Sequence, residues 1–188
     1  MKTIRDILDQ LLSNGPVKIA IEGGSASGKT TLSKQLAALY DCSVLHMDDF
    51  FLQAHQRTPE RYAEVGGNID RERFLQEVLG PLRNGQTIRY RKFNCSTMQL
   101  EDEILITPKK LTIIEGVYSM HPAFEAYYDF SIFLDISSGL QKERIVSRNT
   151  PQLAKRYFTE WIPLENTYFE KTNAKQRCDF IMQISENH

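Results

Sequence analysis

The sequence has few cysteines and no long apolar run. Its three cysteines, Cys42, Cys95 and Cys178, are odd in number and widely spaced, a pattern that matches neither a disulfide framework nor a zinc-binding motif. No stretch approaches the roughly 20 apolar residues that a membrane-spanning helix requires. The sequence therefore predicts a protein of the reducing cytoplasm with no membrane partner.

The chain also has no excess of charge of either sign. Its formal net charge is -1 over 188 residues, so there is no general electrostatic reason to expect nucleic acid as a partner. Any anionic ligand must be held by a local site, which favours a small-molecule substrate. The length fits a single domain over residues 1–188. A homo-oligomer stays open, because the aromatic residues around Trp161 could line the core, a lid or a subunit contact.

Short apolar runs alternate with helical patterns along the chain, and each run is a strand candidate. The runs cover residues 17–21, 44–47, 111–114, 130–136 and 180–184. Such alternation predicts an α/β fold, with a parallel sheet of about five strands and helices on both faces. Helical patterns cover 4–12, 32–39, 74–82, 140–148 and 159–171. The helix over 74–82 is expected to stop near Gly80-Pro81. Residues 86–107 fit this scheme less well and predict a small hairpin outside the main sheet, where 87–90 pairs with 104–106.

A glycine-rich segment follows the first strand candidate and opens a helix candidate. Residues 23–30 read GGSASGKT and fit G-x-x-x-x-G-K-[ST]. The glycines allow the backbone to turn its N–H groups toward phosphate oxygens, and the helix that follows adds its N-terminal dipole. Lys29 can reach the β- and γ-phosphates, and the hydroxyl of Thr30 can bind Mg²⁺. The sequence therefore predicts a P-loop for ATP, with the contacts Gly23, Gly24, Ser25, Ala26, Ser27, Gly28, Lys29, Thr30 and Thr31.

Acidic residues follow two of the strand candidates. Asp48 and Asp49 come directly after the second strand, and Glu115 ends the run 111–114. The carboxyl ends of parallel strands face the ligand crevice, so an aspartate there could accept a proton from a substrate hydroxyl, and Glu115 could hold Mg²⁺. Each could instead cap a turn or lie at a loop edge. The spacing alone leaves both interpretations open.

Three further residues have competing interpretations. Asp70 precedes a helix candidate, and it could be a plain N-cap or a carboxylate that binds a sugar diol. Arg144 and Arg148 lie four residues apart on one helix face, and they could form a solvated basic face or lead into a lid over residues 149–158.

Taken together, these segments resemble the uridine kinase family of P-loop kinases, which is close to the nicotinamide riboside and phosphoribulokinase-like kinases. The resemblance covers most of the chain in order. Its segments are GGSASGKTT from Gly23, MDDFF from Met47, GGNIDRERF from Gly66, IIEGVYS from Ile113, and the stretch 134–149.

The resemblance implies an ATP- and Mg²⁺-dependent phosphotransferase and assigns roles by position. Asp48 matches the base that takes the proton from the ribose 5′-hydroxyl, and Asp70 matches the acid that binds the ribose diol. Glu115 matches the acid near Mg²⁺, and Arg144 and Arg148 match arginines that act in catalysis from the lid. Tyr90 and Phe93 are rival candidates for the aromatic residue that recognises the base.

Two departures from the family pattern leave the acceptor open. No histidine after Phe93 matches the one that helps to read a pyrimidine, and the stretch 149–158 is short for a lid. Besides uridine or cytidine, the acceptor could be nicotinamide riboside, pantothenate or a sugar phosphate. A sugar phosphate would need an anion site, for which the candidates are Arg57, Arg71, Arg91 and Lys92. A nucleotide-dependent regulatory module without turnover is a further alternative, although the chain has no guanine-reading N-K-x-D motif.

Overall fold

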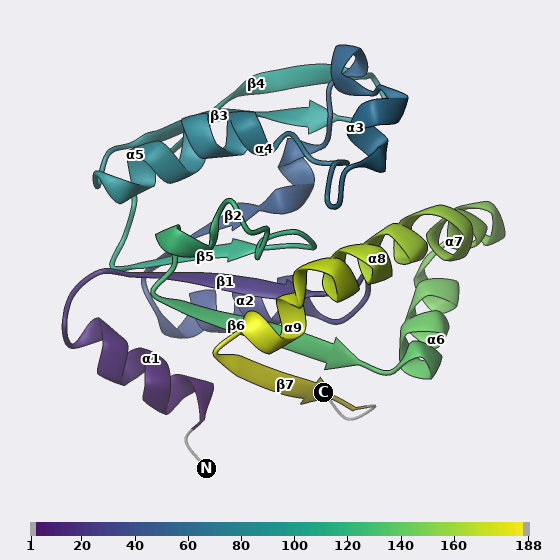
Figure 1. The fold of residues 1–188 in the computed structure, drawn as a ribbon. Helices are drawn as coiled ribbons and strands as arrows, with labels where there is room; N and C mark the ends of the chain where they lie inside the picture. Colours follow the sequence, from purple (N-terminus) through teal and green to yellow (C-terminus); the bar gives the residue numbers. More distant parts are fainter. Residues whose placement is uncertain (1–2, 186–188) are drawn as a thin grey trace.

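Five parallel strands form one sheet in the order β2-β5-β1-β6-β7 in the computed structural model, which describes residues 3–185 (Figure 1). All the pairings in this sheet are parallel, and β1 lies at its centre between β5 and β6. The predicted parallel α/β fold is confirmed. The strands are β1 (Val17–Gly23), β2 (Cys42–His46), β5 (Leu111–Glu115), β6 (Phe130–Ile136) and β7 (Phe180–Ile184).

Both faces of this sheet are covered, which is why its strands read as nearly continuous apolar runs. In β1, Ile19 and Ile21 face a cluster that includes Leu8 of α1 (Ile4–Leu12) and Leu36 of α2 (Lys29–Leu39). Ala20 faces the opposite side, which is covered by α8 (Ile162–Thr172) and α9 (Ala174–Arg177). The predicted helices on both faces are therefore confirmed.

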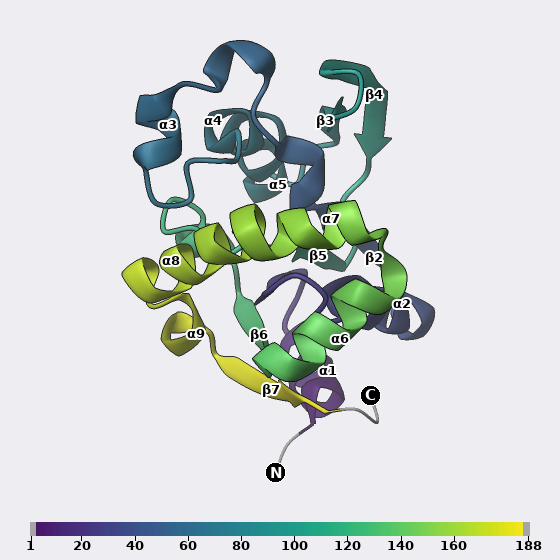
Figure 2. The same ribbon diagram turned by 90° about the vertical axis from the view of Figure 1, so that its right-hand side faces the viewer.

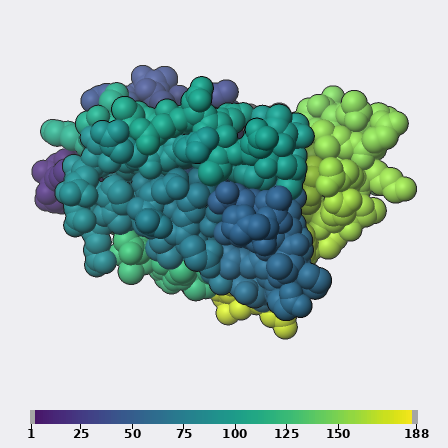
Figure 3. All heavy atoms as spheres, turned by 90° about the horizontal axis from the view of Figure 1, so that it is seen from above, coloured from purple at the N-terminus to yellow at the C-terminus, as the bar shows by residue number. Residues whose placement is uncertain are grey.

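A second layer lies beside the main sheet and is built from the chain between β2 and β5 (Figures 1 and 3). It contains an antiparallel hairpin in which Ile88 pairs with Ile106 and Tyr90 pairs with Ile104, so the predicted hairpin is confirmed. The elements of this layer are β3 (Ile88–Asn94), β4 (Gln99–Ile106), α3 (Pro59–Ala63), α4 (Arg71–Phe74), α5 (Gly80–Arg83) and the short turns Met47–Phe50 and Ala54–Gln56. We call residues 47–106 the cap layer.

The helix predicted to stop near Gly80-Pro81 continues to Arg83 instead. A π-helical turn over Leu75–Leu79 precedes the proline, and the N–H of Gly80 donates to the carbonyl of Leu75. The wider turn changes the hydrogen-bond register, so the missing N–H of Pro81 interrupts no continuous α-helical ladder. The same arrangement recurs at Pro163, which follows a π-helical turn over Tyr157–Trp161.

A pair of helices lies in front of the carboxyl ends of the strands (Figure 2). Helix α6 (Ser138–Arg148) turns at residues 149–150 into α7 (Pro151–Arg156), which continues through the π-helical turn into α8. The segment predicted as a lid, residues 149–158, is therefore this corner and the first helical turns after it. Within residues 3–185, no helix combines the length and the apolar character needed to cross a membrane.

One carboxyl group is fully buried in the core behind the P-loop. Glu22 of β1 has no exposed surface, and its carboxylate accepts hydrogen bonds from the N–H of Gly23 (2.9 Å), the N–H of Met120 (2.9 Å) and the hydroxyl of Tyr168 (3.0 Å). Burial raises the pKa of Glu22 to about 7, against the opposing effects of these donors and of Lys29. The carboxyl is therefore largely neutral in mild acid and charged above neutrality.

This arrangement predicts a pH-dependent cost for Tyr168→Phe. The hydroxyl stabilises the charged form of Glu22, so its removal should raise the pKa of Glu22 further in the folded state. The free energy of unfolding should fall by about 1–3 kcal/mol above pH 7, where the carboxylate is charged. The loss should be clearly smaller near pH 5.5, where the folded chain holds the proton.

Urea unfolding at the two pH values measures the difference, and Tyr128→Phe is the matched control. The hydroxyl of Tyr128 is buried and makes no hydrogen bond with any described residue, so its removal should be neutral at both pH values. An equal loss for Tyr168→Phe at pH 5.5 and pH 8 would contradict the assignment.

Candidate functional site

The P-loop has the backbone conformation that its glycines predict. Gly23 has φ of +145°, and a Cβ there would lie 2.6 Å from the carbonyl oxygen of Leu134. Gly28 has φ of +101° and is the N-cap of α2. The hydroxyl of Ser27 is buried inside the loop and has no hydrogen-bond partner among the described residues. The loop thus forms a tight cradle at a helix N-terminus, which fits a phosphate group.

Lys29 begins α2, and its ammonium group lies against the loop. Its Nζ donates to the carbonyls of Gly23 (2.7 Å) and Gly24 (3.0 Å), and the side chain is buried. These two carbonyls hold the ammonium group at the cradle, where phosphate oxygens could replace them as hydrogen-bond acceptors.

Thr30, Glu115 and His46 form a chain of hydrogen bonds beside Lys29. The Thr30 hydroxyl donates to Oε1 of Glu115 (2.9 Å), and Nδ1 of His46 lies 2.6 Å from the same oxygen. Burial alone would raise the pKa of Glu115, but the contacts with His46, Thr30 and Lys29 outweigh it and hold that pKa below its usual value. The contact with Glu115 is also the main reason why the pKa of His46 is raised. The charged form of the Glu115 carboxyl is therefore stabilised.

This set of oxygen atoms fits Mg²⁺ that is held in part by phosphates. Mg²⁺ prefers oxygen ligands and usually takes only one or two from protein carboxylates, with water and substrate phosphates as the rest. Thr30 and Glu115 supply one hydroxyl and one carboxylate at the mouth of the cradle. No group of three or more His, Cys, Asp or Glu residues within residues 3–185 could form a cage of protein ligands alone.

The two aspartates after β2 are in opposite situations. Asp48 is exposed, and its carboxylate makes no hydrogen bond or ion pair with the described part of the chain. Protein atoms around the cleft still remove part of its hydration, which raises its pKa; Lys29 opposes this effect, and Glu115 and Asp49 add to it. Asp48 thus faces Lys29 and Glu115 as a carboxylate that is open to solvent.

Asp49 is instead buried and is bonded to other residues of the cap layer. Its carboxylate accepts a hydrogen bond from the hydroxyl of Tyr90 (2.8 Å) and lies 3.4 Å from Nζ of Lys92, while its carbonyl accepts from Arg73 (3.0 Å). The ring of Tyr90 is only 3% exposed and stacks on Phe50. Asp49 therefore ties the turn after β2 to the hairpin, and Tyr90 is part of that tie.

The other predicted substrate residues also lie in the cap layer. Asp70 accepts from the backbone N–H of Arg73, so the N-cap interpretation is confirmed. Its carboxylate is 2% exposed and also accepts from the guanidinium of Arg73 (3.2 Å) and from Gln53 (3.3 Å). Phe93 is buried, with the guanidinium of Arg57 over its ring at 5.5 Å.

The two predicted lid arginines, Arg144 and Arg148, contact different parts of the structure. Arg144 donates to the carbonyl of Ala26 in the P-loop (3.3 Å). Arg148 is exposed and lies over the ring of Tyr157 at 6.0 Å, at the corner between α6 and the helix that follows. The structure thus brings Lys29, Thr30, Glu115, Asp48 and Arg144 to the P-loop, and it places Arg148 with the corner and Asp70, Tyr90 and Phe93 in the cap layer.

The sequence did not point to three residues that contact the P-loop. Glu22 had a usable signal, because it is a charged residue between an apolar run and the first glycine of the loop. Gln141 of α6 donates to the carbonyl of Ser25 (2.9 Å), and Glu165 of α8 accepts from the N–H of Ser25 (2.8 Å). No sequence pattern indicates Gln141 or Glu165, because each is a polar residue in a largely polar helix, more than 100 residues away from the loop along the chain.

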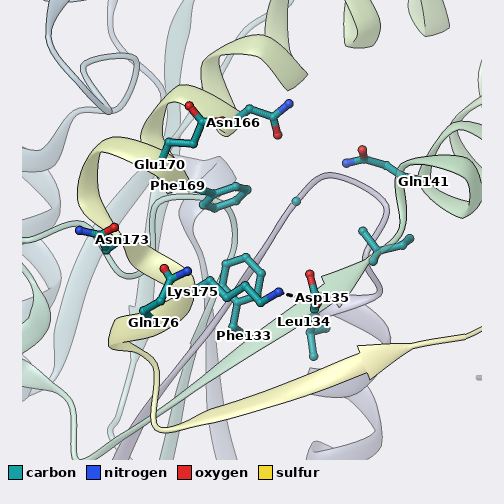
Figure 4. Close-up of a pocket in the computed structure, with 12 residues that line it drawn as sticks. Phe133, Leu134, Asp135, Gln141, Asn166, Phe169, Glu170, Asn173, Lys175 and Gln176 are labelled. Atoms are coloured by element: carbon teal, nitrogen blue, oxygen red, sulfur yellow. Dashed lines mark hydrogen bonds and ion pairs between the residues drawn. The ribbon is translucent and has the colours of Figure 1, made fainter.

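A cavity of ≈ 430 Å³ lies behind the loop, between the end of β6, the start of α6 and helices α8 and α9 (Figure 4). Gly24 is its only P-loop residue, and its other walls include Phe169, Asn173 and the ion pair between Lys175 and Asp135 (2.7 Å). None of Lys29, Asp48 or Glu115 lines it. The candidate phosphate-binding site is therefore the cradle and not this cavity.

The close contact at Gly23 predicts that Gly23→Ala disables the loop. The added Cβ must push the carbonyl of Leu134 away, and the positive φ strains an alanine, so the free energy of unfolding should fall by about 1–3 kcal/mol. Binding of ATP, measured by isothermal titration calorimetry, should be lost. Gly139→Ala is the control, because a Cβ there meets nothing within 4 Å in α6. ATP binding by Gly23→Ala at the parent's affinity would show that the loop tolerates the shift.

Comparison with known proteins places this geometry in a family. The model of the Phosphoribulokinase / Uridine kinase family matches residues 18–157. A uridine kinase from Macrococcus caseolyticus is 27% identical over 180 residues, covering 87% of this chain and 86% of that protein. The fold is similar to that of a possible uridine kinase from Bacillus stearothermophilus (TM-score 0.67, 20% identity, 95% and 98% of the chains). It is also similar to a proposed fructose transport system kinase from Silicibacter sp. TM1040 (TM-score 0.73, 21% identity, 97% and 100% of the chains). With its P-loop, its acid at Glu115 and its parallel sheet, the chain belongs to the Phosphoribulokinase / Uridine kinase family of P-loop kinases.

Proposed function

We propose that this kinase transfers the γ-phosphoryl group of ATP to a primary hydroxyl of a nucleoside-like small molecule, with the 5′-hydroxyl of uridine or cytidine as the acceptor. The observation that carries the proposal is Asp48. It is an exposed carboxylate that makes no hydrogen bond with residues 3–185, and it lies beside Lys29 and Glu115 at the carboxyl edge of the sheet. A structural aspartate would be paired, as Asp49 is.

In this mechanism, Asp48 orients the acceptor hydroxyl and takes its proton as the hydroxyl oxygen attacks the γ-phosphorus. The raised pKa of Asp48 suits this role, because a carboxylate with a higher pKa is a stronger base. Lys29 exchanges the carbonyls of Gly23 and Gly24 for phosphate oxygens and stabilises the charge that develops on them. Thr30 and Glu115 would hold Mg²⁺, which neutralises phosphate charge when bound.

The choice of a nucleoside rests on the cap layer and on the relatives. Asp70 would bind the ribose diol while it keeps its N-cap hydrogen bond, because its two oxygens can serve different donors. Its bond with Gln53 is the longest of its contacts and the easiest to exchange. Of the two rival aromatic residues, Phe93 would meet the base, because Tyr90 is stacked on Phe50 and bonded to Asp49. Curated relatives that match most of the chain carry the name uridine kinase.

The alternatives receive less support. The four basic residues considered for a sugar phosphate each have an internal partner: Arg57 binds the Leu52 carbonyl, Arg71 pairs with Glu64, Arg91 binds the Glu101 carbonyl, and Lys92 pairs with Asp49. A regulatory module without turnover does not explain why an exposed carboxylate, Asp48, lies beside the P-loop. Nicotinamide riboside and pantothenate also present a primary hydroxyl, so they belong in the test.

Asp48→Asn should separate catalysis from folding. Because the Asp48 carboxylate makes no hydrogen bond within the described part of the chain, the variant's midpoint of thermal unfolding and its affinity for ATP should equal those of the parent. Its kcat should fall by about 10²–10⁴-fold, since the proton has no acceptor. Asp49→Asn is the matched control: it disturbs the contacts with Tyr90 and Lys92, so it should lose stability and keep most of its turnover. Equal turnover of Asp48→Asn and the parent would remove Asp48 as the base.

The acceptor is identified by ADP release from Mg-ATP with uridine, cytidine, nicotinamide riboside, pantothenate and ribulose 5-phosphate. We expect release with uridine or cytidine and little without an acceptor. Stimulation by pantothenate or ribulose 5-phosphate alone would replace the nucleoside proposal. Silence across the panel with intact ATP binding would favour the regulatory alternative.

A further inference from the structure

A carboxylate from α8 is bonded to the phosphate loop. Glu165 is 4% exposed, and its Oε2 accepts a hydrogen bond from the backbone N–H of Ser25 (2.8 Å). The hydroxyl of Ser25 donates to Oε1 of the same carboxylate. Both oxygens of Glu165 are therefore used by one residue of the loop, and this bidentate contact joins positions 140 residues apart.

The same part of the loop is held from α6. The carbonyl of Ser25 accepts from Nε2 of Gln141 (2.9 Å), and the carbonyl of Ala26 accepts from Arg144 (3.3 Å). Ala26 itself has φ of +63°, a left-handed conformation that costs an alanine free energy. A strained residue keeps such a conformation only when its surroundings hold it there. Here the surroundings are the side chains of α6 and α8 that bind the polar groups of Ser25 and Ala26.

A second contact ties α8 to the start of the loop. Tyr168 lies three residues after Glu165 on one face of α8, and its hydroxyl donates to Glu22, which in turn accepts from the N–H of Gly23. One helix face therefore holds the loop at Gly23 and at Ser25. Because α8 continues, through α7 and the π-helical turn, from the corner at residues 149–150, a movement of that corner would be passed to both points of the loop.

We propose that Glu165 is a positioning residue for ATP: it holds Ser25, and with it the strained turn at Ala26, in the shape in which the loop binds phosphate. It acts through Ser25 and does not contact the nucleotide. The N–H groups of the first turn of α2, which lack helical partners, stay available for phosphate oxygens. This inference rests on the proposed function only in that the loop holds the phosphates of ATP.

The opposite role for Glu165 is a block. A carboxylate at an anion site could occupy the place of a phosphate, and its removal would then tighten ATP binding. The contact geometry favours positioning for two reasons. The carboxylate of Glu165 also binds the side chain of Ser25. In addition, the ammonium group of Lys29 donates to the carbonyls of Gly23 and Gly24 and forms no ion pair with Glu165 in the described structure. The two roles predict changes of opposite sign in the affinity for ATP.

The test measures the affinity of the full chain for Mg-ATP by isothermal titration calorimetry, together with the midpoint of thermal unfolding. Glu165→Ala should weaken binding by about tenfold or more, the size of one lost charge-assisted hydrogen bond. Glu165→Gln keeps an oxygen for the N–H of Ser25 and should recover part of this loss. Ser25→Ala with Glu165→Ala should weaken binding by less than the product of the two single effects, because both substitutions remove the bond between the Ser25 hydroxyl and Glu165.

Glu160→Gln is the control, because Glu160 lies on the same continuous helix, is exposed and pairs only with Arg156 among the described residues. It should bind ATP as the parent does. The proposal is overturned if Glu165→Ala and Glu165→Gln bind Mg-ATP within twofold of the parent, if they bind it more tightly, or if the two single effects multiply. A chain that loses thermal stability and keeps its affinity would mean a purely structural role. No acceptor is needed, so a failed acceptor panel leaves this test intact.

Discussion

The phosphate loop depends on one close approach of two backbones. Where β1 ends, Gly23 passes the carbonyl of Leu134 on β6 at a distance that no side chain allows. This contact lets the chain leave the centre of the sheet with a positive φ and turn directly into α2, so that Lys29 and Thr30 stand at the end of the central strand. The neighbouring strands β5 and β2 then bring Glu115 and Asp48 to the same edge.

Three parts of the chain meet at this edge, and each contributes a different kind of group. The sheet supplies the cradle and the oxygen atoms suited to Mg²⁺. The cap layer supplies buried polar bonds such as Asp49–Tyr90 and Asp70–Arg73, which join the turn after β2 to the hairpin and to α4. The helices in front of the strands hold the loop from outside through Gln141 and Glu165. Buried carboxylates occur here because each one is bonded by several donors.

The features that could be predicted from the sequence are those that a local pattern determines. The strands at 130–136 and 180–184 were predicted with their observed bounds, since both form short apolar runs. The glycines of the P-loop and the N-cap at Asp70 also follow from local rules. The end of a helix at Pro81 was predicted wrongly, because a π-helical turn, which no simple periodicity reveals, changes the hydrogen bonds before the proline. The spacing alone could not separate Asp48 from Asp49, and only the family resemblance selected Asp48. Glu165 could not be found either, since the partners of Asp49 and Glu165 lie far away along the chain.

The central claim is that the γ-phosphoryl group goes to an organic hydroxyl and not to water. Turnover of Mg-ATP in ¹⁸O-labelled water, with uridine and cytidine present and the products analysed by mass spectrometry, tests this most directly. The account predicts that the phosphoryl group appears on the nucleoside without ¹⁸O, because the attacking oxygen comes from the acceptor. Inorganic phosphate that carries one ¹⁸O from water, with no phosphorylated nucleoside, would contradict it.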